Sequence, residues 1–473
     1  MRDDASTVSM LFAWPSSGKR KILLESIAGH AENLRHYGRL LPLLLALDGR
    51  RIDLDPEVNS GLEKLCQRYP QQLQIVDEIS RQAFLESLPH DIDGTSASFA
   101  LVPSLDDGFS SRGPGRNRNM MLLAAAGGLL LASDDDILCT PATNKNKGSF
   151  GLEYSSELFP LPLRFYADRA ALLAEITKGE CDIVTEHQRY LGHNASEFFN
   201  NDAPAAQGKI VLSCAGCYGD SGLGRARTVL GLKDTMRSHM LKSGYEQTRY
   251  SREVTRIPDR VLIGPSMVFM TGHSGYDVRE YLPPFFPLGG NEDGFFAMLV
   301  RVCSPGSLTV FPSFGLFHDP PEQRPYSRES LVGFKPNSTE LLMALTLACL
   351  PDRSLSDTRS RMIQLGKNYV DISLVSNSDF VEIMHQCWSQ GAMAYVEDLR
   401  MLLDTHDRQP ILWASDIDEL LENIYMLMRE PHTLFGPNGC GLKVEQVKAL
   451  LLKYGRLLEV WPDMLDFAAN NKT

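Results

Sequence analysis

Four short apolar runs, separated by segments long enough to form a helix, restrict the fold of this chain more than any other feature. The first three read VSMLFAW at residues 8–14, LLPLLLALDG at 40–49 and LQIVD at 73–77. The fourth, LLLASDDD at 129–136, follows a predicted helix at 116–128. Strands that alternate with helices pair in parallel as βαβ units, in a sheet flanked by helices. We therefore predict an α/β fold for this part of the chain.

The sequence pattern changes near residue 330. From there, apolar residues recur at helical spacing in four segments, at 338–350, 381–406, 416–430 and 443–461. In the third of these, Asp416 stands three residues before Glu419, which predicts an acidic capping box at the start of a helix. We predict one domain at residues 1–330, with an irregular insertion at about 150–250, and an all-helical domain at 331–473.

Composition and charge exclude several classes of protein. The hydrophobic fraction of 43% and the charged fraction of 22% are ordinary for a globular protein. A net charge of −12 argues against a general nucleic-acid binder, which normally has a basic face. The longest apolar runs, at 40–47 and 121–132, fall below the ~18–20 residues that a membrane span needs. No secretory signal is evident at the start, so we expect a cytoplasmic protein without an integral membrane segment.

Two short motifs suggest functions that the surrounding residues do not support. Cys214 and Cys217 form a CxxC pair, but no second pair stands at the spacing of a zinc site, so we expect reduced thiols. The sequence SGKR is similar to part of a phosphate-binding loop, but Ala13 stands where that motif needs glycine and Arg20 where it needs serine or threonine. We therefore interpret the basic residues at 19–21 as the solvated start of a helix at 17–38.

Three consecutive aspartates end the fourth apolar run. Asp134 and Asp136 are separated by one residue, so at the end of a strand their carboxylates can converge on one divalent cation. Asp135 then lies on the opposite side of the extended chain. Ligands of open α/β sheets bind at the carboxyl ends of the strands. The alternative interpretation is a polar turn after a buried strand.

Two later segments carry further candidate residues. Glu292 and Asp293 stand between a loop rich in proline and glycine and an apolar, helix-like run. His318 stands alone in an aromatic and proline-rich stretch. The structural alternatives are a helix cap for the two acids, which the helix dipole favours, and a hydrogen-bonded core position for the histidine.

Taken in order, these features resemble the GT-A glycosyltransferases, especially the inverting enzymes similar to family 2, over about residues 8–325. The resemblance implies a Rossmann-like, mostly parallel sheet, a nucleotide-sugar donor, and Mn²⁺ or Mg²⁺ as cofactor. It implies that Asp134 and Asp136 hold the metal against the diphosphate and that His318 completes the metal shell. It also implies that Asp293 is the catalytic base, with Glu292 beside it.

The resemblance also assigns residues to the donor. Asp48 matches an acid that contacts the nucleobase, and Arg116 and Asn117 occupy the position of an ARN-like motif before the aspartates. The acidic motif can also be aligned so that it includes Asp135. In that alignment Asp135 is a further contact to the nucleotide-sugar donor.

The expected function is metal-dependent transfer of a hexose, with inversion, from a nucleotide-sugar, a UDP-sugar being favoured. The acceptor is expected to be a peptide, a glycan or a small molecule, and the helical domain to serve as a dimer interface or as a platform for a large acceptor. Two alternatives stay open. One is a nucleotidyltransferase on a similar fold, and the other is a non-catalytic interaction protein on a degenerate transferase scaffold.

Overall fold

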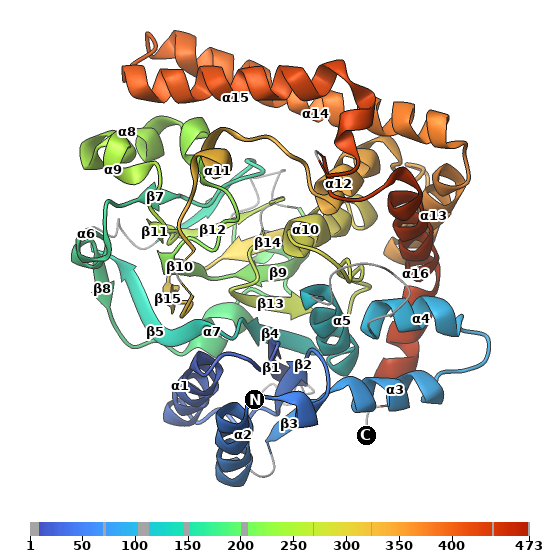
Figure 1. Cartoon of the computed structure of the whole chain (residues 1–473). Coiled ribbons are helices and arrows are strands. Elements are labelled where there is room, and N and C mark those ends of the chain that lie inside the picture. Colours follow the sequence, from blue (N-terminus) through green and yellow to red (C-terminus); the bar gives the residue numbers. More distant parts are fainter. Residues whose placement is uncertain are drawn as a thin grey trace.

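The computed structural model describes residues 9–69, 72–102, 113–145, 151–199, 207–267, 269–322, 324–437 and 439–471. These residues form two β-sheets with helices around them (Figure 1). In the described residues the larger sheet has nine strands, in the order β3-β2-β1-β4-β13-β9-β14-β12-β6. The second sheet has six, in the order β7-β11-β10-β15-β5-β8.

The larger sheet is mixed. Its strands are β1 (Met10–Ser16), β2 (Leu43–Leu47), β3 (Leu73–Val76), β4 (Leu129–Ser133), β6 (Leu152–Tyr154), β9 (Ile210–Cys214), β12 (Val261–Gly264), β13 (His273–Asp277) and β14 (Leu308–Phe311). Strands β3, β2, β1 and β4 are parallel to one another, and β13 runs antiparallel between β4 and β9. Every residue of β2 and β4 is buried, as expected for strands covered on both faces.

The second sheet stands at the carboxyl edge of the first. It consists of β5 (Ile137–Asn144), β7 (Arg164–Phe165), β8 (Ile176–Lys178), β10 (Gly216–Asp220), β11 (Glu253–Thr255) and β15 (Gly315–His318). Three strands of the larger sheet lead directly into it, β4 into β5, β9 into β10 and β14 into β15. The three aspartates are the whole connection between β4 and β5, so they lie where the two sheets meet.

Helices flank the sheets and form the C-terminal region. Up to residue 332 they are α1 (Ile22–His36), α2 (Pro56–Arg68), α3 (Glu78–Ser87), α4 (Gly94–Leu101), α5 (Pro114–Ala124), α6 (Arg169–Ala174), α7 (Ile183–Gln188), α8 (Asp234–Ser243), α9 (Tyr245–Thr248), α10 (Glu292–Cys303) and α11 (Arg328–Val332). The C-terminal helices are α12 (Ser338–Ala348), α13 (Thr358–Ser373), α14 (Asn377–Thr405), α15 (Ile411–Arg429) and α16 (Val444–Asn470). Short 3₁₀ turns are η1 (Arg51–Asp53), η3 (Ala195–Glu197), η5 (Ala226–Gly231) and η6 (Pro431–Leu434). Among the described residues, every helix is too short or too polar to span a bilayer.

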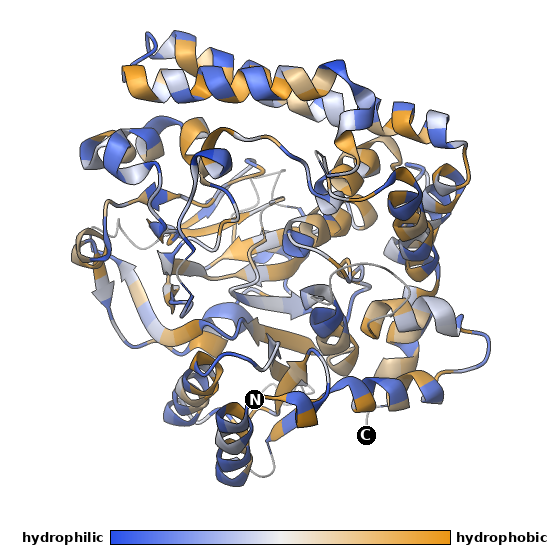
Figure 2. Ribbon diagram, viewed as in Figure 1, coloured by the Kyte–Doolittle hydropathy of each residue, from blue (hydrophilic) through white to orange (hydrophobic). Residues whose placement is uncertain are grey.

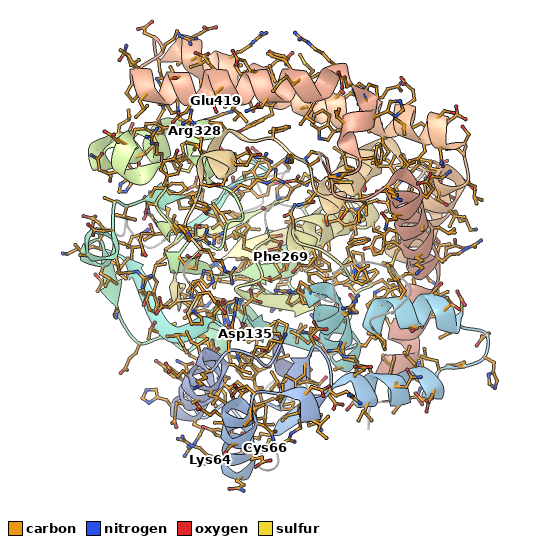
Figure 3. All side chains as sticks on the ribbon, viewed as in Figure 1. Lys64, Cys66, Asp135, Phe269, Arg328 and Glu419 are labelled. Carbon is orange, nitrogen blue, oxygen red and sulfur yellow. The ribbon has the colours of Figure 1, made fainter. Side chains whose placement is uncertain are left out.

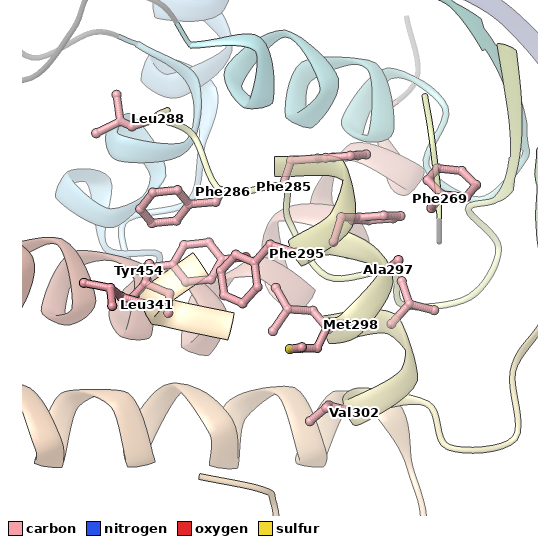
Figure 4. Packing of buried hydrophobic residues seen from close by; sticks show 14 of the residues in the cluster. Phe269, Phe285, Phe286, Leu288, Phe295, Ala297, Met298, Val302, Leu341 and Tyr454 are labelled. Atoms are coloured by element: carbon pink, nitrogen blue, oxygen red, sulfur yellow. The ribbon is translucent and has the colours of Figure 1, made fainter. Parts of the chain in front are cut away.

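The apolar core is continuous from the sheet into the C-terminal helices. Apolar residues are concentrated on the central strands and on the inward faces of the helices (Figure 2). In Figure 4, Phe286 lies close to Tyr454 of α16, and their ring centroids are 5.1 Å apart. The rings of Phe285 and Phe296 stack with centroids 4.0 Å apart. The polar atoms of two aromatic side chains in this core are hydrogen-bonded as well. The Tyr454 hydroxyl donates to the Pro284 carbonyl at 2.6 Å, and Trp461 Nε1 donates to the Leu282 carbonyl at 2.8 Å.

The α/β class and the helical C-terminal region agree with the prediction from sequence. Residue 150 and residues 200–206 of the predicted insertion lie outside the described residues, and the rest of it contributes strands to both sheets. The predicted capping box at Asp416 is wrong, because Asp416 lies inside α15 and is 1% exposed. The helix begins five residues earlier, after Pro410, and Asp416 faces inward instead of capping an end.

Candidate active site

A cleft of about 1130 Å³ opens at the carboxyl edge of the larger sheet, between it and the second sheet. Most of the residues singled out from the sequence line this cleft: Asp48, Asn117, Asp134, Asp135, Asp136, Glu292, Asp293 and His318. They come from the ends of β2 and β4, from α5, from the start of α10 and from the end of β15. Figure 3 labels Asp135, one of the residues that line this cleft. One site thus unites segments up to 270 residues apart, Asp48 and His318.

Arg118 of α5 joins two of the predicted acids. Its guanidinium contacts Asp134 Oδ1 at 2.6 Å and Glu292 Oε1 at 2.8 Å, and it also donates to the Thr271 hydroxyl at 2.6 Å. Burial raises the pKa of Glu292 to about 7 and that of Asp134 to about 6, although the charge of Arg118 works against both increases. This buried triad fixes the start of α10 against the end of β4.

Asp136 is held between two cationic groups. Its Oδ1 lies 3.3 Å from His318 Nε2 and its Oδ2 lies 2.6 Å from Arg20 Nη1. Burial favours the neutral carboxyl, but the hydrogen bond and charge of His318 and the charge of Arg20 outweigh it and lower the pKa of Asp136 to about 2. At His318, the hydrogen bond and charge of Asp136 likewise outweigh burial and raise the pKa of the imidazole to about 9. The second ring nitrogen of His318 contacts the Asp220 carbonyl oxygen at 2.7 Å, which fixes the direction of the ring.

The interpretation of residues 19–21 as a solvated helix start is wrong for Arg20. Its side chain turns into the cleft, where it contacts Asp135 at 3.1 Å as well as Asp136, and its Nε contacts Glu322. The backbone between β1 and α1 directs the three side chains differently. Lys19 lines the cleft, whereas Lys21 points outward and pairs with the exposed Glu57. Asp135 also accepts a hydrogen bond from the Ser16 hydroxyl, so it is anchored to the end of β1.

The candidate donor residues form a buried polar floor below the cleft. Arg116 is 2% exposed and its Nη2 lies 3.8 Å from Asp48 Oδ1. Asn117 donates to the Ser16 carbonyl at 3.2 Å and accepts a hydrogen bond from Arg81. Arg81 also donates to backbone carbonyls at the ends of β2 and α4, so it locks these elements together.

Asp293 differs from Glu292, its neighbour in the sequence. Its carboxylate lines the cleft at the first turn of α10, where the helix dipole stabilises a negative charge. Its Oδ1 accepts the Gly294 backbone N–H at 2.8 Å. In the described part of the chain, no hydrogen bond to its Oδ2 is present, so this oxygen is available to a ligand.

Arginine or histidine side chains pair with Asp134, Asp135, Asp136 and Glu292, and these carboxylates are divided between two separate clusters. Among the described residues, no three histidine, cysteine, aspartate or glutamate side chains converge closely enough to hold a metal ion. Asp136 and His318 are the pair that fits a metal best, since an imidazole nitrogen and a carboxylate oxygen already face each other. Cys214 is buried, and its thiol donates to the Met270 carbonyl.

Sequence reasoning missed the basic half of the site. Arg118 and Arg20 form ion pairs with the carboxylates that the sequence did predict, and Arg81 donates a hydrogen bond to Asn117 below the cleft. The motif RNRN carried a signal for Arg118, because a helix with four consecutive polar residues before a buried strand must place some of them in the interior. Arg20 gave no comparable signal.

Comparisons with known proteins add no further assignment. No model of a protein family matches the chain, and a search of curated proteins found no match.

Proposed function

We propose that the cleft binds a nucleotide-sugar and transfers its sugar to an acceptor hydroxyl with inversion of configuration. The observation that supports this proposal most is the convergence of Asp48, the aspartates at 134–136, the acids at 292–293 and His318 in one cleft. These acids are separated widely in the sequence, yet each stands at the carboxyl end of a strand or the start of a helix. That edge is where α/β sheets bind nucleotides.

Asp293 is proposed as the base. Its carboxylate is bound by only one backbone N–H among the described residues and lines the cleft, so it can accept the proton of an acceptor hydroxyl. Glu292 is excluded from that role by its ion pair with Arg118 and instead positions the start of α10. A single base with a single displacement implies inversion at the transferred carbon.

Cationic side chains are proposed to bind the diphosphate. Lys19 and Arg20 line the cleft beside the aspartates, and guanidinium and ammonium groups bind phosphate oxygens with charge-assisted hydrogen bonds. Asp136 and His318 would hold a Mn²⁺ or Mg²⁺ ion, with Asp134 nearby. Such an ion would neutralise the negative charge that develops on the leaving diphosphate. Because Asp136 raises the pKa of His318 to about 9, the imidazole would have to lose its proton to hold such an ion.

The proposal is tested by thermal unfolding with UDP-, GDP-, dTDP- and CDP-sugars and with ATP, each with and without Mn²⁺. A ligand that binds the native state stabilises it, by about 2.7 kcal/mol at a hundredfold excess over Kd. We expect Mn²⁺-dependent stabilisation by one sugar nucleotide. Stabilisation by ATP with none from any sugar nucleotide would instead favour a nucleotidyltransferase or kinase.

Two variants separate binding from chemistry. Asp136→Ala should lose the Mn²⁺-dependent part of the stabilisation, because it removes the proposed oxygen ligand. Asp293→Asn should retain sugar-nucleotide binding and lose transfer to an acceptor by at least about a hundredfold, the usual contribution of a general base. An Asp293→Asn enzyme with undiminished turnover would refute the assignment of the base.

A further inference from the structure

A buried arginine on the second-sheet side of the cleft lacks a charged partner. Arg256 follows β11, is 7% exposed and lines the cleft. One guanidinium nitrogen, Nη2, donates to the Ser221 carbonyl oxygen at 2.5 Å. Its Nε and Nη1 are shielded from solvent and have no hydrogen-bond partner in the described residues. Within the same residues no carboxylate forms an ion pair with Arg256.

Other buried arginines use their donors differently or lie away from the cleft. Arg237, 6% exposed, also donates to one carbonyl and has an unpaired Nε, but its guanidinium lies over the Trp413 ring and it does not line the cleft. Arg361 is equally buried at 7% exposure, but its guanidinium donates to the backbone carbonyls of Val302, Asp352 and Leu355. Arg118, also buried, contacts two carboxylates. Burying a charge without compensation costs free energy, so a buried cation that faces a cleft with unused donors is suited to binding an anion.

The surroundings of Arg256 leave room for such a ligand. Asp220, which precedes the Ser221 that Arg256 contacts, is already engaged by Arg252 through two hydrogen bonds, at 2.6 and 2.8 Å. Gly222 separates Arg256 from His318: a Cβ at this glycine would lie 3.2 Å from His318 Cε1 and 3.7 Å from Arg256 Nη2. With a φ of +65° and no side chain, Gly222 leaves the facing sides of these two residues uncovered.

We infer that Arg256 forms an oxyanion subsite, which binds a carboxylate or phosphate group on the substrate that enters from the second-sheet side of the cleft. A guanidinium binds both groups through paired N–H donors. Nε and Nη1 are shielded from solvent, so an anion would reach them only once the guanidinium turns toward the cleft. If the proposed function holds, this substrate is the acceptor, and the acceptor is acidic. That identification rests on the proposed function, whereas the anion site itself does not.

The first test measures stability in buffer without oxyanions and in buffer with inorganic phosphate. Arg256→Met removes the charge and retains most of the volume, so without oxyanions its Tm should equal or exceed that of the wild type. If phosphate is the anion that binds, it should raise the Tm of the wild type by more than that of the variant, in which Lys19 and Arg20 are still present. If the carboxylate binds instead, D-glucuronate should give this difference. Arg260→Met, at a half-exposed arginine near Glu153, is the matched control and should respond as the wild type does.

The second test distinguishes the two anions by calorimetric titration with inorganic phosphate, with D-glucuronate and with neutral D-glucose. We expect one of the two anions to bind the wild type, glucose not to bind, and the affinity for that anion to fall about tenfold or more in Arg256→Met. Arg256→Lys should retain part of the affinity.

Three results would overturn the inference: no binding of either anion to the wild type, equal binding to the wild type and Arg256→Met, or a clear loss of stability in Arg256→Met without oxyanions. The last result would show that the guanidinium has a structural role. These measurements use no sugar nucleotide, so they remain informative if the proposed transferase function fails.

Discussion

At the scale of single residues, the site depends on how buried charges are compensated. Glu292 and Asp293 are adjacent in the sequence, but the first is buried against Arg118 and the second faces the cleft. Successive residues in the first turn of a helix point in directions about 100° apart, so the start of α10 separates the two roles. The guanidinium of Arg118 contacts both Glu292 and Asp134 and so compensates the two carboxylates together.

Replacement of Arg118 by Met should therefore be strongly destabilising. It leaves the buried Glu292 and the partly buried Asp134 uncompensated, and loss of one partner from a buried pair costs about 3–5 kcal/mol. Both carboxyl groups have raised pKa values in the fold, so their charged forms are penalised and the penalty disappears on protonation. The loss should be largest near pH 8 and smallest near pH 5, in chemical denaturation.

The control for this prediction is Arg50→Met, which removes a half-exposed pair with Asp53. Such pairs contribute about 0–1 kcal/mol, so this variant should stay close to the wild type at both pH values. An Arg118→Met protein with the same loss at pH 5 and pH 8 would contradict the role assigned to the buried charges.

A second residue-scale prediction concerns three histidines buried beneath the cleft. The ring centroids of His30 and His273 are 5.4 Å apart, and those of His187 and His273 are 5.0 Å apart. Burial lowers the pKa of His30 to about 4 and that of His187 to about 3, and burial together with the neighbouring rings lowers that of His273. All three are neutral in the fold, while the unfolded chain takes up protons below about pH 6.5.

The cluster should therefore stabilise the fold fully above pH 6.5 and progressively less as the pH falls toward 4. Each histidine contributes about 1.4 kcal/mol per pH unit to this slope. His273→Phe keeps an aromatic ring in the stack and removes one titrating group, so its stability relative to the wild type should rise as the pH falls. Denaturation profiles at pH 7, 6, 5 and 4 measure this, with exposed His36→Gln as the control. Parallel profiles for His273→Phe and the wild type would contradict the prediction.

At the scale of elements, α5 organises the floor of the site although it has no amphipathic pattern. Its four residues Arg116 to Asn119 are all buried, because the helix is enclosed by the sheet, by α4, by α10 and by α16. Each polar side chain in turn binds a different neighbour. Asn119 accepts the Phe285 N–H at 2.7 Å and donates to the carbonyls of Phe285 and Ala100. This amide thereby connects α5 to the loop that leads to Asp293.

Asn119→Ala should weaken that connection. It leaves the Phe285 amide and two carbonyls without their partner, and a buried unsatisfied group costs about 1–3 kcal/mol. We expect a loss of stability in this range, together with faster amide hydrogen exchange in residues 282–290, measured by mass spectrometry. Asn59→Ala on α2, whose side chain is partly exposed, should change neither. Unchanged exchange in the 282–290 loop would show that Asn119 does not hold it.

The sequence predicted those parts of the fold and site that depend on local pattern. The strands around Leu45 and Leu131 were evident because continuous apolar runs with polar ends are typical of buried parallel strands. The aspartates at 134–136 follow one such run, so their position at the cleft follows from it. Arg20 and Arg256 could not be found in this way, because the direction of a flexible side chain depends on tertiary contacts. Asp416 was misplaced because the helix begins at Ile411, five residues before it.

At the scale of the whole molecule, the C-terminal helices are attached to the rest of the chain by core packing and by buried polar contacts. Trp413 of α15 donates to the Leu230 carbonyl of η5 at 3.1 Å. Asp416, one turn further on, accepts hydrogen bonds from the Tyr245 hydroxyl at 2.5 Å and from Arg249 at 3.1 Å, and it contacts Arg328. The labels of Arg328 and Glu419 in Figure 3 mark this junction between α11 and α15. Asp416 therefore acts as a buried attachment point for α15.

Asp416→Ala should release α15, because it leaves Arg249 and the Tyr245 hydroxyl without their acceptor in a buried position. Breaking a buried pair from one side costs about 3–5 kcal/mol. Asp418→Ala on the same helix is the matched control, since Asp418 pairs with Arg408 at the surface, where such a pair contributes about 0–1 kcal/mol. Chemical denaturation gives both losses, and limited proteolysis of the segment between α14 and α15 reports the release directly. If the two variants lose the same stability and are cleaved at the same rate, α15 is held by its apolar face alone and the buried aspartate contributes little to the attachment.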